Sequence, residues 1–256
     1  MDKGTFAGVS LAFAGILAGL LLEGGKIAQI LQPTAAMIVF GGTVGAVMVQ
    51  FPLGTVVQAT KSLVHVFRDS GREPKTVIAD LVVYAQQARK DGIVSLDSQL
   101  ANINDIFLKK SLMLAIDGTE PKELREIMEL DLDNQDERNE KLAQVFESAG
   151  GFAPTVGIIG AVLGLIQVMQ HLENINEVGK GIAVAFVATI YGVGSANILF
   201  LPWAGKLRIK FRAEQVVREM VVEGVTSILE GMNPRMLESK LVGYLDEKQQ
   251  KSASSV

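Results

Sequence analysis

The chain has 256 residues, of which 48% are hydrophobic and 20% are charged, and its formal net charge is −4. This composition is too apolar for a typical soluble domain and too charged for a protein lying wholly in a bilayer, so a protein with membrane and aqueous parts is expected. The absence of cysteine excludes disulfides, thiolate zinc sites and cysteine nucleophiles. Two histidines, and no basic patch interleaved with aromatic residues, argue against a histidine metal site and against nucleic acid as a partner.

Four uncharged apolar runs predict four membrane-spanning helices. The runs cover residues 4–22, 35–51, 148–172 and 181–205. Because about 20 apolar residues in an α-helix span a bilayer core, with some tolerance on either side, all four runs are long enough. The first run has no clear cleavage site after it, so we expect a retained helix rather than a signal peptide.

A polar stretch separates the second run from the third. Its apolar residues recur at the helical period, most clearly within residues 76–89. We therefore expect an all-α membrane protein, with a helical cytoplasmic domain between spans two and three and a cytoplasmic C-terminal helix. The tail, residues 246–256, is polar and is expected to be disordered. The predicted division is 4–54 for spans one and two, 55–147 for the cytoplasmic domain, 148–205 for spans three and four, and 206–256 for the C-terminal helices and tail.

Basic residues flank the spans unevenly. The two short loops, after span one and after span three, carry only Lys26 and Lys180. By the positive-inside rule, these loops face outside, whereas the polar domain and both termini are cytoplasmic. The basic residues that follow spans two and four are Lys61, Arg68, Arg72, Lys75, Lys206, Arg208, Lys210 and Arg212.

None of the four runs contains Asp, Glu, Lys or Arg. A proton pathway across a membrane needs titratable groups, so any proton conducted by this chain must use a carboxylate of a partner chain. The sequence shows neither a nucleophile–base pair nor a phosphate-binding glycine loop, so we expect no enzymatic activity and no cofactor.

Small residues form a stripe along each of the last two runs, and each run also contains a proline, Pro154 or Pro202. Such stripes let a neighbouring helix backbone come close, and a proline inside a helix frees a carbonyl and bends the axis. Two interpretations of the stripes stay open: contact between two spans of this chain, or contact with a helix of another protein. The stripes are Ala153, Gly157, Gly160 and Gly164 in span three, and Ala185, Thr189, Gly192 and Ala196 in span four.

A series of motifs runs in order along nearly the whole chain. It comprises Glu23-Gly24-Gly25, ARKDGIVSLDS at 88–98, Phe107-Leu108-Lys109, Asp117-Gly118, PTVGIIGAVLG at 154–164, AFVATIYG at 185–192, Pro202-Trp203 and Asn233-Pro234-Arg235. The series resembles the MotA/PomA family of flagellar motor stator subunits, within the wider MotA/TolQ/ExbB proton channel superfamily. The related TolQ/ExbB energisers have a three-span arrangement, so the additional span predicted at residues 35–51 favours the flagellar branch.

The resemblance implies a stator subunit of the bacterial cytoplasmic (inner) membrane, surrounded by lipid, that couples ion flow to torque on a flagellar rotor switch protein. It implies a ring of five chains around a dimer of a MotB-like single-span partner, whose membrane Asp binds and releases the ion. The alternative is an energiser subunit of a TolQ/ExbB-like or other envelope motor complex, which has no rotor to contact.

The same resemblance assigns rotor-contacting charges to the cytoplasmic domain. Arg89 matches the basic residue that faces the rotor, and Lys90 is its basic neighbour. Asp97 occupies a position where the family usually has Glu, so the charge is kept on a side chain one carbon shorter. Exposed ion pairs are weak, about 0–1 kcal/mol, which suits contacts that form and break during stepping.

The resemblance also assigns an ion pathway and a coupling device. Thr189 matches a pathway threonine close to the partner's Asp, and Pro154 and Pro202 match prolines that couple ion binding to movement of the cytoplasmic domain. Ala161 lies where sodium-driven members have Thr. Because sodium requires oxygen ligands and alanine offers none, a proton is favoured over sodium as the transported ion.

Overall fold

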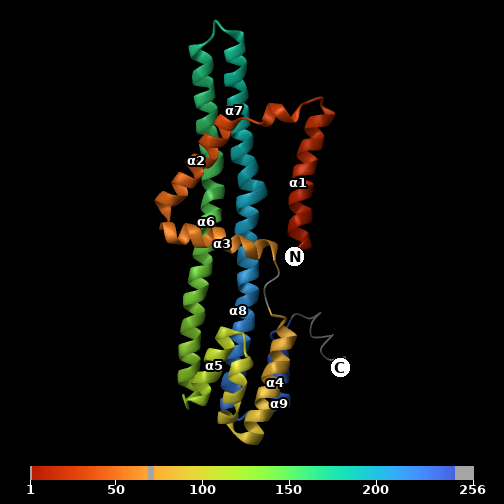
Figure 1. Cartoon of the computed structure of the whole chain (residues 1–256), viewed down its shortest axis with the longest axis vertical. Helices are drawn as coiled ribbons and strands as arrows, with labels where there is room; N and C mark the ends of the chain where they lie inside the picture. Colours follow the sequence, from red (N-terminus) through yellow and green to blue (C-terminus); the bar gives the residue numbers. More distant parts are fainter. Residues whose placement is uncertain (1, 69–71, 246–256) are drawn as a thin grey trace. The chain divides into compact units, whose positions relative to one another are not determined.

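The computed structural model describes residues 2–68 and 72–245, and within these ranges the regular structure is entirely helical (Figure 1). The chain forms two compact units. Unit 1 comprises residues 1–69 and 139–209, and unit 2 comprises residues 70–138 and 210–256. The expected disordered tail, 246–256, lies outside the described residues.

Unit 1 contains four helices that are long and apolar enough to cross a membrane. They are α1 (Lys3–Leu22), α2 (Pro33–Gln50), the apolar part of α6 (Pro121–Gln170) and the helix that begins as α7 (Ile175–Ser195). A short 3₁₀ helix, η1 (Ile27–Ile30), joins α1 to α2. The predicted four-span, all-helical membrane fold is therefore confirmed.

The ends of α1 and α2 follow from their sequences. The Asp2 side chain accepts a hydrogen bond from the amide of Thr5 (3.1 Å) and caps the start of α1. Gly24, with φ of 78°, turns the chain at the other end of α1, a conformation that glycine adopts without strain. Pro33 opens α2, where its missing N–H costs nothing.

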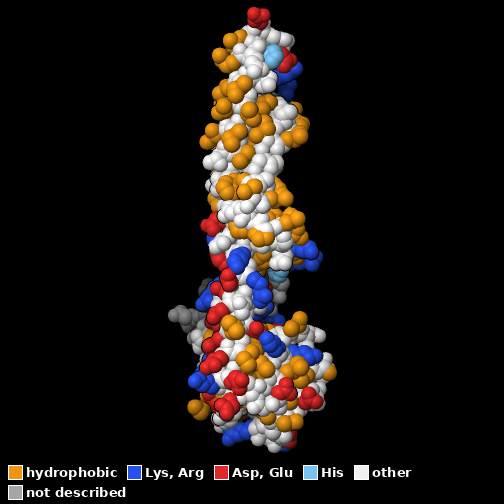
Figure 2. Space-filling view, turned by 90° about the vertical axis from the view of Figure 1, so that its left-hand side faces the viewer, with side chains coloured by type: hydrophobic (Ala, Val, Ile, Leu, Met, Phe, Trp, Pro, Cys, Tyr) orange, Lys and Arg blue, Asp and Glu red, His pale blue; other side chains and the backbone are white. Residues whose placement is uncertain are grey.

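The α6–α7 connection differs from the prediction. The expected polar loop, 173–180, is mostly helix, because α7 already begins at Ile175. The Asn174 side chain caps it by accepting from the amide of Asn176 (3.2 Å), and Glu177 pairs with Lys180 one turn into the helix (2.7 Å). Polarity therefore marks the end of the apolar run, not the end of the helix. Figure 2 shows the hydrophobic side chains along the α6–α7 hairpin and the charged ones gathered at its free end.

Two further segments complete unit 1. The helix α3 (Leu53–Phe67) follows α2 almost directly and runs across α6 (Figure 1). The fourth span continues from α7 through a π-helical turn, η3 (Ala196–Phe200), into α8 (Leu201–Leu229). Neither the π-helical turn nor the unbroken continuation of α6 from residue 121 was predicted.

Unit 2 contains α4 (Pro74–Asp91), the 3₁₀ segment η2 (Ile93–Asn102), α5 (Ile106–Ile116) and α9 (Pro234–Val242), together with one end each of α6 and α8. Apolar residues from all of these helices form one core, whose largest fully buried members are Leu81, Leu96, Leu108, Leu112, Leu124, Met128, Met220, Leu237 and Leu241. The predicted helical domain and C-terminal helix are thus present.

Candidate functional site

The α6–α7 hairpin is packed so tightly that side chains are excluded from its centre. A Cβ on Gly157 would lie 2.9 Å from the carbonyl oxygen of Ala188, and a Cβ on Gly192 would lie 2.5 Å from the carbonyl oxygen of Ala153. Toward the free end, a Cβ on Gly164 would lie 2.7 Å from the carbonyl oxygen of Gly181. The helices meet backbone to backbone, as small-residue stripes allow.

This packing decides between the two interpretations of the stripe in span three. The stripe faces α7 of the same chain, so it is already occupied and does not hold a helix of another protein. On α7 the contacting residues are Gly181, Ala185, Ala188 and Gly192. Thr189 therefore lies one residue beyond the contact rather than within it.

The helix α2 covers another side of this hairpin. Its residues Ala35 and Val39 are fully buried against Val187 and Ala188 of α7. The hydroxyl of Tyr191 fastens the segment before α2. It donates to the carbonyl of Ile30 (2.6 Å) and accepts from the amide of Gln32 (3.3 Å).

Ala161 and Thr189 lie beside the α6–α7 contact. Ala161 follows Gly160 in the sequence, and Thr189 follows Ala188. Gly160 and Ala188 belong to the contact, because a Cβ on Gly160 would lie 2.7 Å from the Cβ of Ala188. Both are half-buried. The Thr189 hydroxyl donates to the carbonyl of Ala185 (3.2 Å), so its proton is engaged while its oxygen can still accept.

The outward face beside Thr189 is apolar. Phe186, Ile190 and Val193 of α7 are 69%, 50% and 46% exposed in the isolated chain. No acidic or basic residue lies between Gly181 and Gly205, or between Ser148 and Gln170. An ion moving along this face would find the Thr189 oxygen but no titratable group of this chain.

The two prolines perturb their helices in different ways. Pro154 lies inside α6, where it leaves the carbonyl of Gly150 without its usual amide partner. Pro202 lies two residues after the π-helical turn, whose closing hydrogen bond runs from the amide of Leu201 to the carbonyl of Ala196. A proline clashes with the carbonyl four residues earlier, and the wider π turn relieves such a clash. Pro202 was thus the available sequence signal for η3.

An aromatic cluster surrounds Trp203, immediately after Pro202. Its indole ring lies 6.4 Å from the ring of Phe67, 6.0 Å from Phe146 and 6.1 Å from Phe200, all edge-on. Such edge-to-face contacts are each worth about 0.5–1.5 kcal/mol beyond area burial. The cluster ties α3, α6 and η3 to the start of α8.

Beyond the last span, the Arg208 guanidinium joins α8 to α6. It contacts Glu140 through two nitrogens (2.7 and 3.1 Å) and Glu147 through one (2.5 Å). The hydrogen bond from Arg208 lowers the pKa of Glu147. The Glu147 carboxylate therefore stays ionised at neutral pH.

The predicted rotor contacts lie on the surface of unit 2. Arg89 and Lys90 occupy the last turn of α4, Asp97 lies in η2, and all three are exposed. Within residues 2–68 and 72–245 none of them forms an ion pair, so the structure does not bring Arg89 and Asp97 together. Gly92, with φ of 83°, makes the turn between the two segments, and buried Leu96 holds η2 in place.

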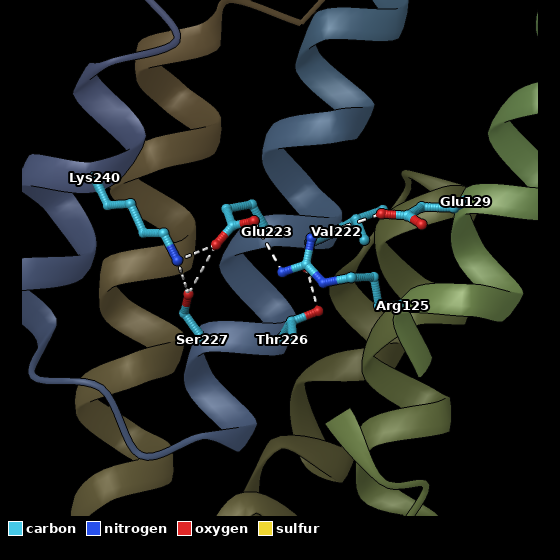
Figure 3. A network of polar contacts seen from close by, with 7 residues as sticks. All are labelled: Arg125, Glu129, Val222, Glu223, Thr226, Ser227 and Lys240. Atoms are coloured by element: carbon cyan, nitrogen blue, oxygen red, sulfur yellow. Dashed lines mark hydrogen bonds and ion pairs between the residues drawn. The ribbon is translucent and has the colours of Figure 1, made fainter. Parts of the chain in front are cut away.

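One network of ion pairs in unit 2, centred on Glu223, could not be predicted from the sequence. Glu223 of α8, 12% exposed, accepts a hydrogen bond from Arg125 of α6 (2.9 Å) and contacts Lys240 of α9 (Figure 3). Burial raises the pKa of Glu223, but the hydrogen bonds from Lys240 and Arg125 outweigh it, and the pKa is lowered. These residues are too far apart in the chain for any local pattern to pair them.

Among the described residues, no group of three or more His, Cys, Asp or Glu side chains is placed to hold a metal ion. The functional candidates are a helix-packed membrane face and an exposed charged surface.

Comparison with known proteins places these features in a family. The sequence model of the MotA/TolQ/ExbB proton channel family matches residues 99–220, and that of the motility protein A N-terminal region matches residues 6–92. Motility protein A of Bacillus subtilis (strain 168) is 36% identical over 97% of this chain and 92% of its own length. The chain belongs to the motility protein A family. The chemotaxis protein PomA of Vibrio alginolyticus is 33% identical over 96% of both chains.

Solved structures agree with this membership. The structure of C. jejuni MotAB matches with a TM-score of 0.91 and 34% identity, over 96% of this chain and 97% of the other. The flagellar MotAB stator complex from Bacillus subtilis matches with a TM-score of 0.89, also at 34% identity. The predicted MotA/PomA family is confirmed, whereas the roles assigned to individual site residues stay predictions.

Proposed function

We propose that the chain is the ion-conducting subunit of a flagellar motor stator and that it couples proton flow to torque for bacterial motility. The observation that carries the proposal is the close-packed α6–α7 hairpin, whose apolar parts, 148–170 and 181–205, contain no acid, in a chain that resembles motility proteins over almost its whole length. A membrane helix pair without a carboxylate can form only one wall of a proton pathway.

The missing carboxylate is then supplied by a MotB-like partner with one membrane span. The similar solved structures are MotAB complexes, which supports such a partner for this chain. We infer a ring of five chains around two partner helices in the bacterial cytoplasmic (inner) membrane. The basic residues after spans two and four support a cytoplasmic location for both termini.

The proton is proposed as the transported ion because of Ala161 and Thr189. Sodium must exchange its hydration waters for oxygen ligands. Ala161 offers none, and the hydroxyl of Thr189 offers a single oxygen whose proton is already donated to Ala185. A proton needs only the partner's carboxylate, which this face leaves in an apolar setting.

We propose that Arg89, Lys90 and Asp97 contact the rotor switch protein. Their exposure and the absence of ion-pair partners for them among the described residues support this role, because a contact that steps must be accessible and weak. Pro154 and Pro202 are proposed to convert ion binding into motion, since each lies where its helix lacks the regular hydrogen bonding.

The proposal is tested by complementation. The chain and a MotB-like partner are expressed in a motile bacterium that lacks its own stators, and rotation of tethered cells is recorded in potassium medium without sodium. We expect rotation. Rotation that stops when sodium is withdrawn would overturn the proton assignment. Complexes that assemble but rotate the cells neither with protons nor with sodium would favour the envelope energiser.

Charge reversal separates rotor contact from assembly. Arg89→Glu and Asp97→Lys are each expected to reduce torque while membrane levels of the complex stay normal. Lys122→Glu is the control, because Lys122 is exposed on unit 2 and, among the described residues, its one ion pair is a long contact with Glu126 (3.9 Å). Equal effects of all three reversals would contradict the assignment.

A further inference from the structure

The helix α3 is attached at both ends to helices that cross the membrane. Only Phe51 and Pro52 separate the end of α2 from Leu53, the first residue of α3, so this end lies within about 10 Å of the end of span two. At the other end, the amide of Asp2, just before α1, donates to the carbonyl of Phe67 (3.0 Å).

The rings of Phe6 and Phe67, 5.3 Å apart, reinforce this second attachment, and Figure 1 shows the start of α1 beside the end of α3. A short connection joins α1 to α2, so the first residue of α1 and the last residue of α2 emerge on the same side of the membrane. A helix fixed at both of these points lies along that membrane surface.

The side chains of α3 are sorted into two faces. Ala59, Ser62 and Val66 are buried within unit 1. On the opposite face Leu53, Val57 and Val64 are 61%, 45% and 52% exposed. At about 100° per residue these three lie within about 40° of one another, so they form a single apolar stripe that points away from the protein.

Two cations border this stripe. Lys61 and Arg68 lie next to it on the helical projection, and both are exposed. Lys61 has no ion-pair partner in the part of the chain that the structure describes, and the sequence from Phe51 to Arg68 contains no acidic residue. An exposed apolar stripe edged by cations is typical of helices that lie at a membrane surface.

We propose that Leu53, Val57, Lys61, Val64 and Arg68 form a binding face for anionic phospholipid. The apolar side chains of this α3 lipid face lie between the acyl chains just below the headgroups, and the two cations extend upward to lipid phosphate. The occupant is lipid because α3 lies at the depth where spans one and two end, and because its charge is opposite to that of an anionic headgroup.

The size of the effect follows from the two charges. A Lys or Arg near an anionic surface contributes about a fivefold gain in affinity, so the pair predicts an enrichment of about 25-fold in low salt. Salt reduces the gain because the Debye length shortens. The apolar stripe contributes to membrane contact but does not distinguish one headgroup from another.

The absence of native cysteine provides a direct experiment. Val64→Cys in the full chain is labelled with bimane and reconstituted into vesicles that contain brominated phosphatidylcholine or, at the same mole fraction, brominated phosphatidylglycerol. We expect both lipids to quench the fluorescence and phosphatidylglycerol to quench it more strongly. Val57→Cys repeats the measurement at a second position of the stripe.

Charge variants separate lipid contact from lipid selectivity. Lys61→Gln with Arg68→Gln is expected to remove the excess quenching by phosphatidylglycerol and to keep the quenching by phosphatidylcholine. Lys109→Gln with Lys122→Gln, which removes the same charge from unit 2, is the matched control and should change neither.

Three outcomes would overturn the proposal. Equal quenching by the two lipids would exclude anionic recognition. Quenching by aqueous iodide but not by lipid would show a solvated face, and quenching by neither would show a face covered by a second copy of the chain or by another protein.

Discussion

Replacement of Gly192 by Ala tests the backbone contact at the centre of the α6–α7 hairpin. The new Cβ would lie 2.5 Å from the carbonyl oxygen of Ala153 and 3.0 Å from the Cα of Gly157. Ordinary contacts begin at 3.4 Å, so α7 must move away from α6 by about 0.9 Å. Overpacking of this kind costs about 1–3 kcal/mol.

Gly194→Ala is the matched control, because a Cβ there meets nothing within 4 Å. Both substitutions gain the same helix propensity, up to about 1 kcal/mol, so the difference between the variants isolates the packing cost. We expect Gly192→Ala to be less stable than Gly194→Ala by about 2 kcal/mol. The same displacement would move Thr189, so torque should fall as well.

Stability is measured by titrating detergent-solubilised protein with dodecyl sulfate and following the fluorescence of Trp203, the chain's single tryptophan. Its ring lies in the Phe67–Phe146–Phe200 cluster and should report loss of packing in unit 1. If the two alanine variants unfold at the same detergent fraction, the hairpin is not held by close backbone contact, and the account of the ion pathway wall loses its basis.

Three further predictions concern single residues. Glu223→Gln should destabilise the chain by about 2 kcal/mol at neutral pH by breaking charged hydrogen bonds, chiefly that with Arg125. Because the pKa of Glu223 is lowered, its contribution is complete above the unfolded value near 4.5 and is lost as pH falls through the folded pKa. Thermal midpoints of the two proteins should therefore converge in acid, and a constant gap would refute the assignment. Tyr191→Phe removes two hydrogen bonds before α2, and amide exchange at Gln32 should accelerate about fivefold; unchanged exchange would contradict this. Ala161→Thr adds an oxygen to the pathway and should make rotation speed depend on sodium, whereas unchanged ion dependence would count against the proton argument.

The sequence predicted the features that depend on composition along the chain. Uncharged runs located the four spans, helical periodicity within residues 76–89 predicted α4, and the absence of an acid in the spans was readable directly. The sequence could not decide what the stripe containing Gly157 faces, because a small-residue stripe fits a helix of either chain. The structure answers this through the contact with Ala188.

Other features depend on tertiary context. Lys240 and Arg125 meet at Glu223 only because α6, α8 and α9 converge there. The polar residues at 173–180 led to the wrong prediction of a loop. The helix α7 instead begins before its apolar run, because Asn174 caps its first turn. Pro202 indicated a local irregularity, but the formation of a π-helical turn depends on where the displaced carbonyl can go.

We have proposed that the α6–α7 face is one wall of an ion pathway whose titrating carboxylate belongs to a partner. Electron cryomicroscopy of the chain co-expressed with its MotB-like partner would show this pathway. We expect five chains around two partner helices, with a partner Asp facing Thr189. A ring of four or six chains, a ring without central helices, or a partner Asp directed away from Thr189 would contradict it.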